Sequence, residues 1–265
     1  MRWLSWIIAR LGHPTACRFI LALALVLALP SLASPLVMDE YAQLLRYRES
    51  TEPHAPSFLN TAFLFADPAN RQRDLESVGM WWMAPDLKIA FWRPLAAFTQ
   101  LIDFRLWPSS ALLMHVHTLV WFALSLLAVA ALYQRFLSQA AANLALAMYA
   151  WDDARGMVLS WIANRHALIS TALGAAVLLV HDKWRRDGWQ LGAWLGPVLL
   201  ALSLLSSEMG LATTAFLLGY ALFMERGALV PRIAQLRPYA LVVVSWQVIY
   251  TLAGYGAVAS GAYLH

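Results

Sequence analysis

The stretch that decides the fold is "RFILALALVLALPSLASPLVMDE", residues 18–40. No charged side chain lies between Arg18 and Asp39. An apolar run of this length crosses a hydrocarbon core of about 30 Å as a single helix. Two carboxylates, Asp39 and Glu40, follow at the point where such a helix would leave the bilayer. The stretch therefore predicts a membrane span at about residues 19–36 with an acidic pair at its mouth.

The rest of the chain has the same bias. Of its 265 residues, 61% are hydrophobic and only 13% are charged, about half the charged share of a soluble domain. Six further apolar runs are found at about 110–133, 139–151, 157–181, 189–206, 209–224 and 239–257. We therefore expect an all-α polytopic membrane protein, with about seven transmembrane helices in a single domain, 1–265.

Basic residues indicate the orientation of these spans. Arginines precede the first span, and lysines and arginines fill alternate short connections: Arg135, Lys183, Arg185, Arg186, Arg226, Arg232 and Arg237. Because such residues favour the cytoplasm, the amino terminus is expected there, in a bacterial plasma (inner) membrane. Topology and anionic lipids also account for the net charge of +4, so no nucleic-acid partner is expected.

Residues 37–109 then form one long extracytoplasmic loop. Its first part, residues 47–74, is rich in Pro, Asn and charge and is expected to be irregular. The segment "DLKIAFWRPLAAFTQLIDFRLW", residues 86–107, repeats apolar residues at helical spacing. We expect a helix in the membrane interface, with Trp92 and Trp107 at headgroup level and with Arg93, Gln100 and Asp103 on a separate polar face.

Acidic residues occur at three places on the expected outer face. These are Asp39 with Glu40, Asp152 with Asp153 in "AWDDARG", and Glu208 in "LSSEMG". Carboxylates that converge from separate loops hold a divalent cation, here Mg or Mn, or act as a base and its orienting partner. The alternative is that each is a solvated loop acid.

Polar residues also fall within two expected spans. In "SWIANRHALIS", residues 160–170, Arg165 must face the protein interior because an arginine is costly in lipid. Its partner is either a ligand phosphate or one of Asp152, Asp153 and Glu208. In "HVH" the two histidines lie about 200° apart on a helix and cannot share one ion, although one of them can line a cavity.

The order of these elements resembles that of the membrane-embedded GT-C glycosyltransferases, close to the O-mannosyltransferases and their relatives with tetratricopeptide repeats. The acidic pair after the first span is followed by "FWRPL", residues 91–95. The segments "HVHTLVWFALSLLAVAALYQRF", "VLSWIANRHALISTALGAAVLL" and "LLSSEMGLATTAFLLGYALF" are similar to the later spans of that family. The likeness covers nearly the whole chain.

The resemblance implies transfer of a sugar from a polyprenyl-phosphate-linked donor to an acceptor hydroxyl outside the cytoplasm. It assigns catalysis to Asp39, with Glu40 beside it. It implies substrate binding by Arg93, His115, Asn164, Arg165 and Glu208. If a divalent cation is used, its ligands are Asp39, Asp152 and Asp153.

The chain also departs from that family. Relatives often have His and Glu at "WDDARG" and Lys at Ser207, and further spans follow, so we expect either the amino-terminal part of a longer protein or a short family member. The competing interpretations are a transporter or lipid flippase, which usually shows inverted repeats, and a non-catalytic truncated membrane protein.

Overall fold

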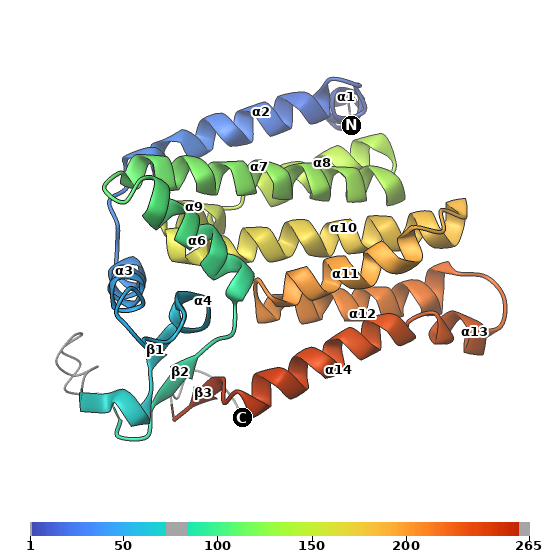
Figure 1. The fold of residues 1–265 in the computed structure, drawn as a ribbon. Helices are drawn as coiled ribbons and strands as arrows, with labels where there is room; N and C mark the ends of the chain where they lie inside the picture. Colours follow the sequence, from blue (N-terminus) through green and yellow to red (C-terminus); the bar gives the residue numbers. More distant parts are fainter. Residues whose placement is uncertain (1, 73–83, 260–265) are drawn as a thin grey trace.

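A computed structural model describes residues 2–72 and 84–259 (Figure 1). The described chain is mostly helical, with one small sheet at an end of the helical bundle. Its α-helices are α1 (Arg2–Leu11), α2 (Ala16–Ala28), α3 (Asp39–Glu49), α4 (Phe58–Thr61), α6 (Pro94–Leu106), α7 (Ala111–Phe136), α8 (Gln139–Ala150), α9 (Ala154–Ser160), α10 (Arg165–Asp187), α11 (Gly192–Leu204), α12 (Ala212–Gly219), α13 (Leu229–Ala234) and α14 (Arg237–Leu252). Single turns of 3₁₀ helix are η1 (Leu29–Ala33), η2 (Pro68–Asn70), η3 (Ile162–Asn164) and η4 (Glu208–Leu211), and Tyr220–Met224 is a π-helical turn.

Three helical segments in the described residues are long and apolar enough to cross a membrane: Ala16–Ala33, Ala111–Phe136 and Ile162–Asp187. Gly192–Leu204 and Glu208–Met224 are apolar but shorter. The prediction of a mostly helical chain is therefore confirmed, and the three long apolar helices are consistent with a membrane protein. Each of the seven predicted runs contains a helix, but only these three reach a spanning length.

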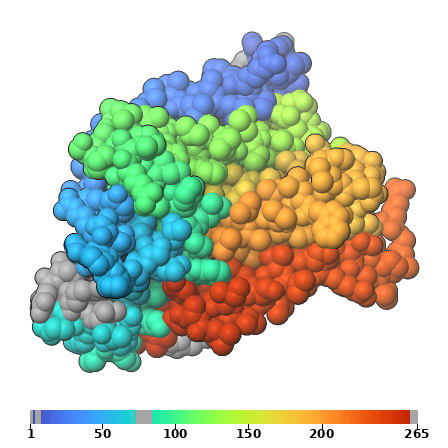
Figure 2. All heavy atoms as spheres, viewed as in Figure 1, coloured from blue at the N-terminus to red at the C-terminus, as the bar shows by residue number. Residues whose placement is uncertain are grey.

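The two ends of the bundle differ in content. α3, α4, α6, α9 and the sheet gather at one end, which we call the loop end, whereas α1 and α13 lie at the opposite end (Figure 1). In the space-filling view, the α3–α4 segment packs over the end of α6 and α7, and α14 follows one edge of the bundle (Figure 2). The long loop predicted at 37–109 therefore covers one end of the bundle.

The third predicted run, 139–151, forms α8, which is too short to cross a hydrocarbon core of about 30 Å alone. α8 has 12 residues and rises about 18 Å, whereas the 26 residues of α7 rise about 39 Å. α9 lies near the start of α7, where the His115 Nδ1 atom is 3.1 Å from the Leu159 carbonyl oxygen. Asp152 and Asp153 lie in the short connection between the end of α8 and the start of α9, directly after the third predicted run.

α6 confirms the predicted helix but reverses its expected faces. The side chains of Gln100 and Asp103 are buried, whereas Phe98 is 49% exposed. In a membrane protein the polar groups of a helix find partners inside the bundle, and its apolar face can meet lipid. Trp107 packs among buried residues and Trp92 stacks on Tyr255 with ring centroids 6.3 Å apart.

A three-stranded antiparallel sheet was not predicted. β1 (Leu64–Ala66) pairs with β2 (Lys88–Ala90), and β2 pairs with β3 (Gly256–Val258), with Ile89 opposite Ala257. Part of the segment expected to be irregular is therefore ordered as α4, β1 and η2. Residues 73 and 74 of that segment lie outside the described residues. The sheet joins the long loop to the end of α14.

Candidate functional site

A cavity of about 440 Å³ opens at the loop end. Its wall comes from the start of α3, from the sheet region and from the segment that leads into α10. The lining residues are Asp39, Phe63, Phe65, Ile89, Phe91, Arg93, Trp161, Ala163, Asn164 and His166. The structure thus brings together three of the predicted site residues, Asp39, Arg93 and Asn164, from parts of the chain about 50 to 70 positions apart.

Asp39 is the first residue of α3, directly after Met38, whose φ is 43°. Burial raises the pKa of the Asp39 carboxyl above its ordinary value of 3.8. A carboxylate with a raised pKa is a stronger base than one in water, so it accepts a proton from a neighbouring hydroxyl more readily. Asp39 therefore has the chemistry of a general base.

Arg93 supplies a fixed positive charge in the same cavity. Its Nε donates to Glu208 Oε2 at 2.8 Å, and its Nη2 lies 2.7 Å from the same oxygen. The guanidinium carbon is 4.3 Å from the centroid of the Phe91 ring and 5.2 Å from that of Phe63. Glu208 is not in the cavity wall, so its place in the structure is behind Arg93, holding the guanidinium in position.

The tautomer of His166 follows from its contact with Arg93. Arg93 Nη1 is 3.0 Å from His166 Nε2, and a guanidinium nitrogen can only donate. Nε2 therefore accepts, and the proton of the neutral ring lies on Nδ1. Among the described residues, His166 Nδ1 is buried without a hydrogen-bond partner, and so is Trp161 Nε1. The walls of the cavity thus contain two N–H donors suited to an oxygen-rich ligand.

Glu40 has a different role from the catalytic one expected by its position. It is 2% exposed, and its carboxylate accepts hydrogen bonds from the backbone N–H groups of Val37, Ile162 and Ala163. It is absent from the cavity wall. Glu40 fastens the start of α3 to η3 and so places Asp39 beside Asn164.

Arg165 is fully buried, but its partner is none of the expected ones. Its Nη1 lies 2.6 Å from Asp103 Oδ2, and its Nη2 donates to the Met114 carbonyl oxygen at 2.8 Å. Its Nε donates to Thr118 Oγ1 at 3.0 Å. Neither Asp152, Asp153 nor Glu208 neutralises it, and it does not line the cavity. The expected carboxylate partners of Arg165 are therefore corrected to Asp103, with further hydrogen bonds to α7, and its role in substrate binding stays a prediction.

The remaining predicted residues also lie apart from the cavity. His115 is buried and bonded to the Leu159 carbonyl oxygen, as described above. Asp152 accepts a hydrogen bond from the backbone N–H of Ala154 at 2.9 Å, and Asp153 directly precedes α9. Both acids are exposed in the connection between α8 and α9.

These positions do not fit the divalent cation considered from the sequence. No group of three or more His, Cys, Asp or Glu side chains that could hold a metal ion occurs in residues 2–72 and 84–259. Of the three proposed ligands, only Asp39 lines the cavity. We therefore derive no step through a metal.

The sequence analysis assigned no site role to the other seven residues of the cavity wall, among them Phe63, Phe65, Trp161 and His166. The alternation in "AFLFA", residues 62–66, is a strand signal that would have placed Phe63 and Phe65 on one side. Trp161 and His166 lie in the same segment as Arg165. A charged residue in an apolar run is a stronger sequence signal than either of them. Burial alone does not tell which of neighbouring polar residues faces a cavity.

No protein-family model matches this chain, and neither does any curated protein or any solved structure.

Proposed function

We propose that this chain is a GT-C-type glycosyltransferase of a bacterial inner membrane. It transfers a sugar from a polyprenyl-phosphate-linked donor to an acceptor hydroxyl on the extracytoplasmic face. The observation that carries the proposal is that Asp39 and the Arg93 guanidinium line one cavity, at the end of the bundle where the first apolar helix emerges. A base and a fixed cation in one cavity are what transfer from a phosphate leaving group requires.

In this mechanism Asp39 takes the proton from the acceptor hydroxyl. The freed oxygen attacks the anomeric carbon of the sugar, and the bond between that carbon and the phosphate oxygen breaks. The electron pair of this bond stays on the polyprenyl phosphate, where Arg93 stabilises the added negative charge. Arginine suits this role because its planar guanidinium can form two hydrogen bonds to one phosphate.

The sugar lies against the aromatic part of the wall. Phe65 and Trp161 offer apolar ring surface, and Trp161 Nε1 and His166 Nδ1 offer hydrogen-bond donors. Asn164 adds an amide that both donates and accepts. Sugar hydroxyls accept and donate hydrogen bonds at the ring edge while their C–H faces pack on aromatic rings, so this wall fits a hexose better than it fits an apolar solute.

The arrangement in the membrane follows from the basic connections. All seven apolar runs cross the bilayer, the shorter ones where the bilayer is locally thinner. The amino terminus is cytoplasmic, and the loop end with its cavity is extracytoplasmic. The exposed Phe98 and Leu106 of α6 face lipid at the loop end, so the polyprenyl tail remains in the bilayer while its phosphate reaches Arg93.

The test is turnover of a labelled donor. Purified full-length chain, supplemented with a membrane extract as a source of acceptor, is incubated with a polyprenyl-phosphate-linked radiolabelled sugar, and release of polyprenyl phosphate is measured. Asp39→Asn is expected to lower the rate by about 10²–10⁴, because the amide cannot take the proton. Asp152→Asn, outside the cavity, serves as the control and should keep the wild-type rate. Release at the wild-type rate by folded Asp39→Asn protein would refute the assignment.

A further inference from the structure

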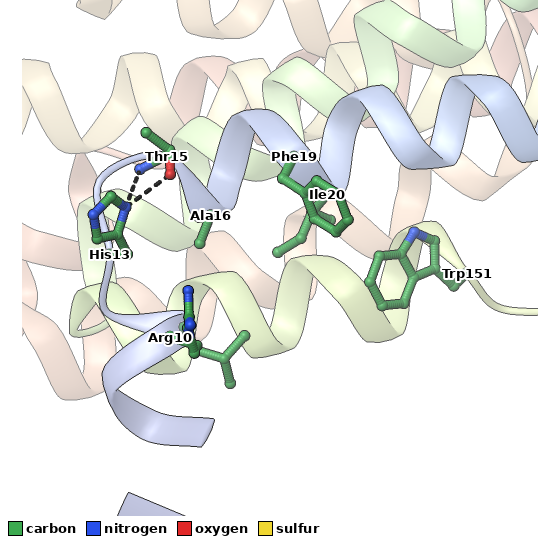
Figure 3. Close-up of a pocket in the computed structure, with 8 residues that line it drawn as sticks. Arg10, His13, Thr15, Ala16, Phe19, Ile20 and Trp151 are labelled. Atoms are coloured by element: carbon green, nitrogen blue, oxygen red, sulfur yellow. Dashed lines mark hydrogen bonds between the residues drawn. The ribbon is translucent and has the colours of Figure 1, made fainter. Parts of the chain in front are cut away.

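The largest of the described cavities lies away from the proposed site. It is a groove of about 650 Å³ between α2 and α8. Figure 3 shows Arg10 and His13 at one end of this groove, Trp151 at the other end, and Phe19 and Ile20 of α2 between them. The basic end belongs to the end of the bundle where α1 lies, opposite the loop end (Figure 1). The groove therefore has one polar, basic end and an apolar length.

The dimensions of the groove suit a lipid chain. It runs beside α8 from Leu11, whose carbonyl oxygen accepts from the Asn143 side chain, to Trp151, eight residues or about 12 Å further along, which is most of one leaflet's half of a hydrocarbon core of roughly 30 Å. Ala16 and Ile20 give it an apolar floor, and Phe19, which is 64% exposed, forms a rim. An extended acyl chain of one leaflet would fill this length.

His13 has a defined hydrogen-bonding direction at the basic end. Its Nδ1 atom accepts from the backbone N–H of Thr15 at 3.3 Å and lies 2.7 Å from Thr15 Oγ1. A backbone N–H can only donate, so Nδ1 is the acceptor nitrogen and the proton of the neutral ring is on Nε2. His13 Nε2 therefore carries an N–H donor, and Arg10 lines the same end of the groove. Together they offer charge-assisted hydrogen bonds to a phosphate.

The charge of the surrounding segment selects among phospholipids. Residues 1–38 contain Arg2, Arg10 and Arg18 and not one Asp or Glu. A zwitterionic headgroup would bring an ammonium that finds no carboxylate in this segment. A headgroup with a net negative charge brings no such unpaired cation, and it is attracted by the arginines.

We propose that the groove between α2 and α8 binds one anionic phospholipid of the leaflet at the α1 end. The phosphate of this lipid lies at Arg10 and His13, and one acyl chain lies along Ala16 and Ile20 towards Trp151. This site is separate from the cavity around Asp39. The lipid-binding proposal does not depend on the glycosyl-transfer proposal, and each has its own test.

The test counts bound lipids by native mass spectrometry of the full chain in a neutral detergent. The probes are phosphatidylglycerol and phosphatidylcholine with the same acyl chains. Wild-type protein should retain one phosphatidylglycerol in preference to phosphatidylcholine. The double variant Arg10→Gln/His13→Gln should bind phosphatidylglycerol about fivefold more weakly or worse, with phosphatidylcholine unaffected. Arg10→Lys, which keeps the charge, should retain most of the preference.

Two matched controls test the position of the site. Arg237→Gln removes an exposed arginine at the start of α14, on the same side of the bundle, and should change nothing. Ala16→Leu fills this groove and should release the retained lipid. The matched control is Gly219→Leu, which fills a different, uncharged apolar groove around Phe136 and Phe216, where an added side chain meets open space. This variant should retain the bound lipid. An unchanged phosphatidylglycerol preference in Arg10→Gln/His13→Gln, or in Ala16→Leu, would overturn the proposal, and so would an equal loss in Arg237→Gln.

Discussion

The guanidinium of Arg165 and the carboxylate of Asp103 form an ion pair with Nη1 and Oδ2 2.6 Å apart, and each side chain is only 1% exposed. Asp103 lies on α6 and Arg165 begins α10. His117 Nδ1 of α7 is also 2.7 Å from Asp103 Oδ1. One buried carboxylate thus joins the loop helix α6 to both of the long helices of the bundle.

Removing the arginine of this pair should destabilise the protein strongly. Arg165→Leu leaves the Asp103 carboxylate buried without its main partner, at a cost of about 3–5 kcal/mol. We expect a much lower melting temperature in detergent, and the loss should not depend on added polyprenyl phosphate. The double variant Arg165→Leu/Asp103→Leu should melt above the single variant, because no charge is stranded. A single variant that melts like the wild type would contradict the pairing.

A second prediction concerns Glu40, which receives three backbone N–H groups. Glu40→Gln replaces one acceptor oxygen by an NH₂ group, so at least one buried N–H group loses its acceptor. The expected loss of stability is about 1–3 kcal/mol. Thermal unfolding in detergent measures it, with the exposed Glu52→Gln as a control that should stay within about 0.5 kcal/mol of the wild type. Equal melting of both variants would show that Glu40 is not an anchor.

The contrast between Asp39 and Glu40 shows which part of the candidate site could be predicted from the sequence. The apolar run and the acids after it predicted where the first helix ends and that a carboxylate lies there. Both carboxylates have nearly the same surroundings in the sequence. Which of them faces a cavity is decided by η3, whose N–H groups lie more than 120 positions away along the chain.

Arg165 and α6 show a second kind of limit. The sequence predicted correctly that Arg165 faces inward, because that follows from the cost of a charge in lipid. Its partner, Asp103, was placed on a solvated face, because the amphipathic pattern of α6 was interpreted as that of a surface helix. The three strands have three residues each, and segments so short carry little periodicity.

The raised pKa of Asp39 leads to a prediction about stability and pH. In the folded state this carboxyl holds its proton more tightly than in the unfolded chain, so the ionised form costs stability. This cost is absent below the ordinary carboxyl pKa of 3.8 and grows as the pH rises through the folded-state pKa. Asp39→Asn should therefore melt a few degrees above the wild type at neutral pH and equally with it near pH 3. A melting temperature lowered at neutral pH would contradict the burial of this charge.

Arg93 and Glu208 should be energetically coupled. Their side chains are 13% and 24% exposed, and two nitrogens of the guanidinium contact one carboxylate oxygen. A double-mutant cycle with Arg93→Gln and Glu208→Gln, measured by thermal unfolding, should give a coupling of about 0.5–3 kcal/mol. Additive effects of the two changes would mean that Glu208 does not position Arg93.

The two ends of the bundle should differ in accessibility. In a Cys17→Ser background, a cysteine at Glu52, at the loop end, should react with a membrane-impermeant maleimide added to intact cells. A cysteine at Gln190, between α10 and α11, should react only after the membrane is permeabilised. Labelling of position 190 in intact cells would reverse the proposed orientation.

The pairing of β3 with β2 has a consequence for how the protein is made. Ile89 of β2 lines the cavity, and its strand partner Ala257 follows the last described helix. During synthesis, β2 leaves the ribosome about 170 residues before its partner, so one edge of β2 stays unpaired while the later helices insert. The strand that carries Ile89 therefore gains its second neighbour only after α14 has been made. A nascent chain halted after α12 would carry every lining residue of the cavity but not the strand that pairs with β2.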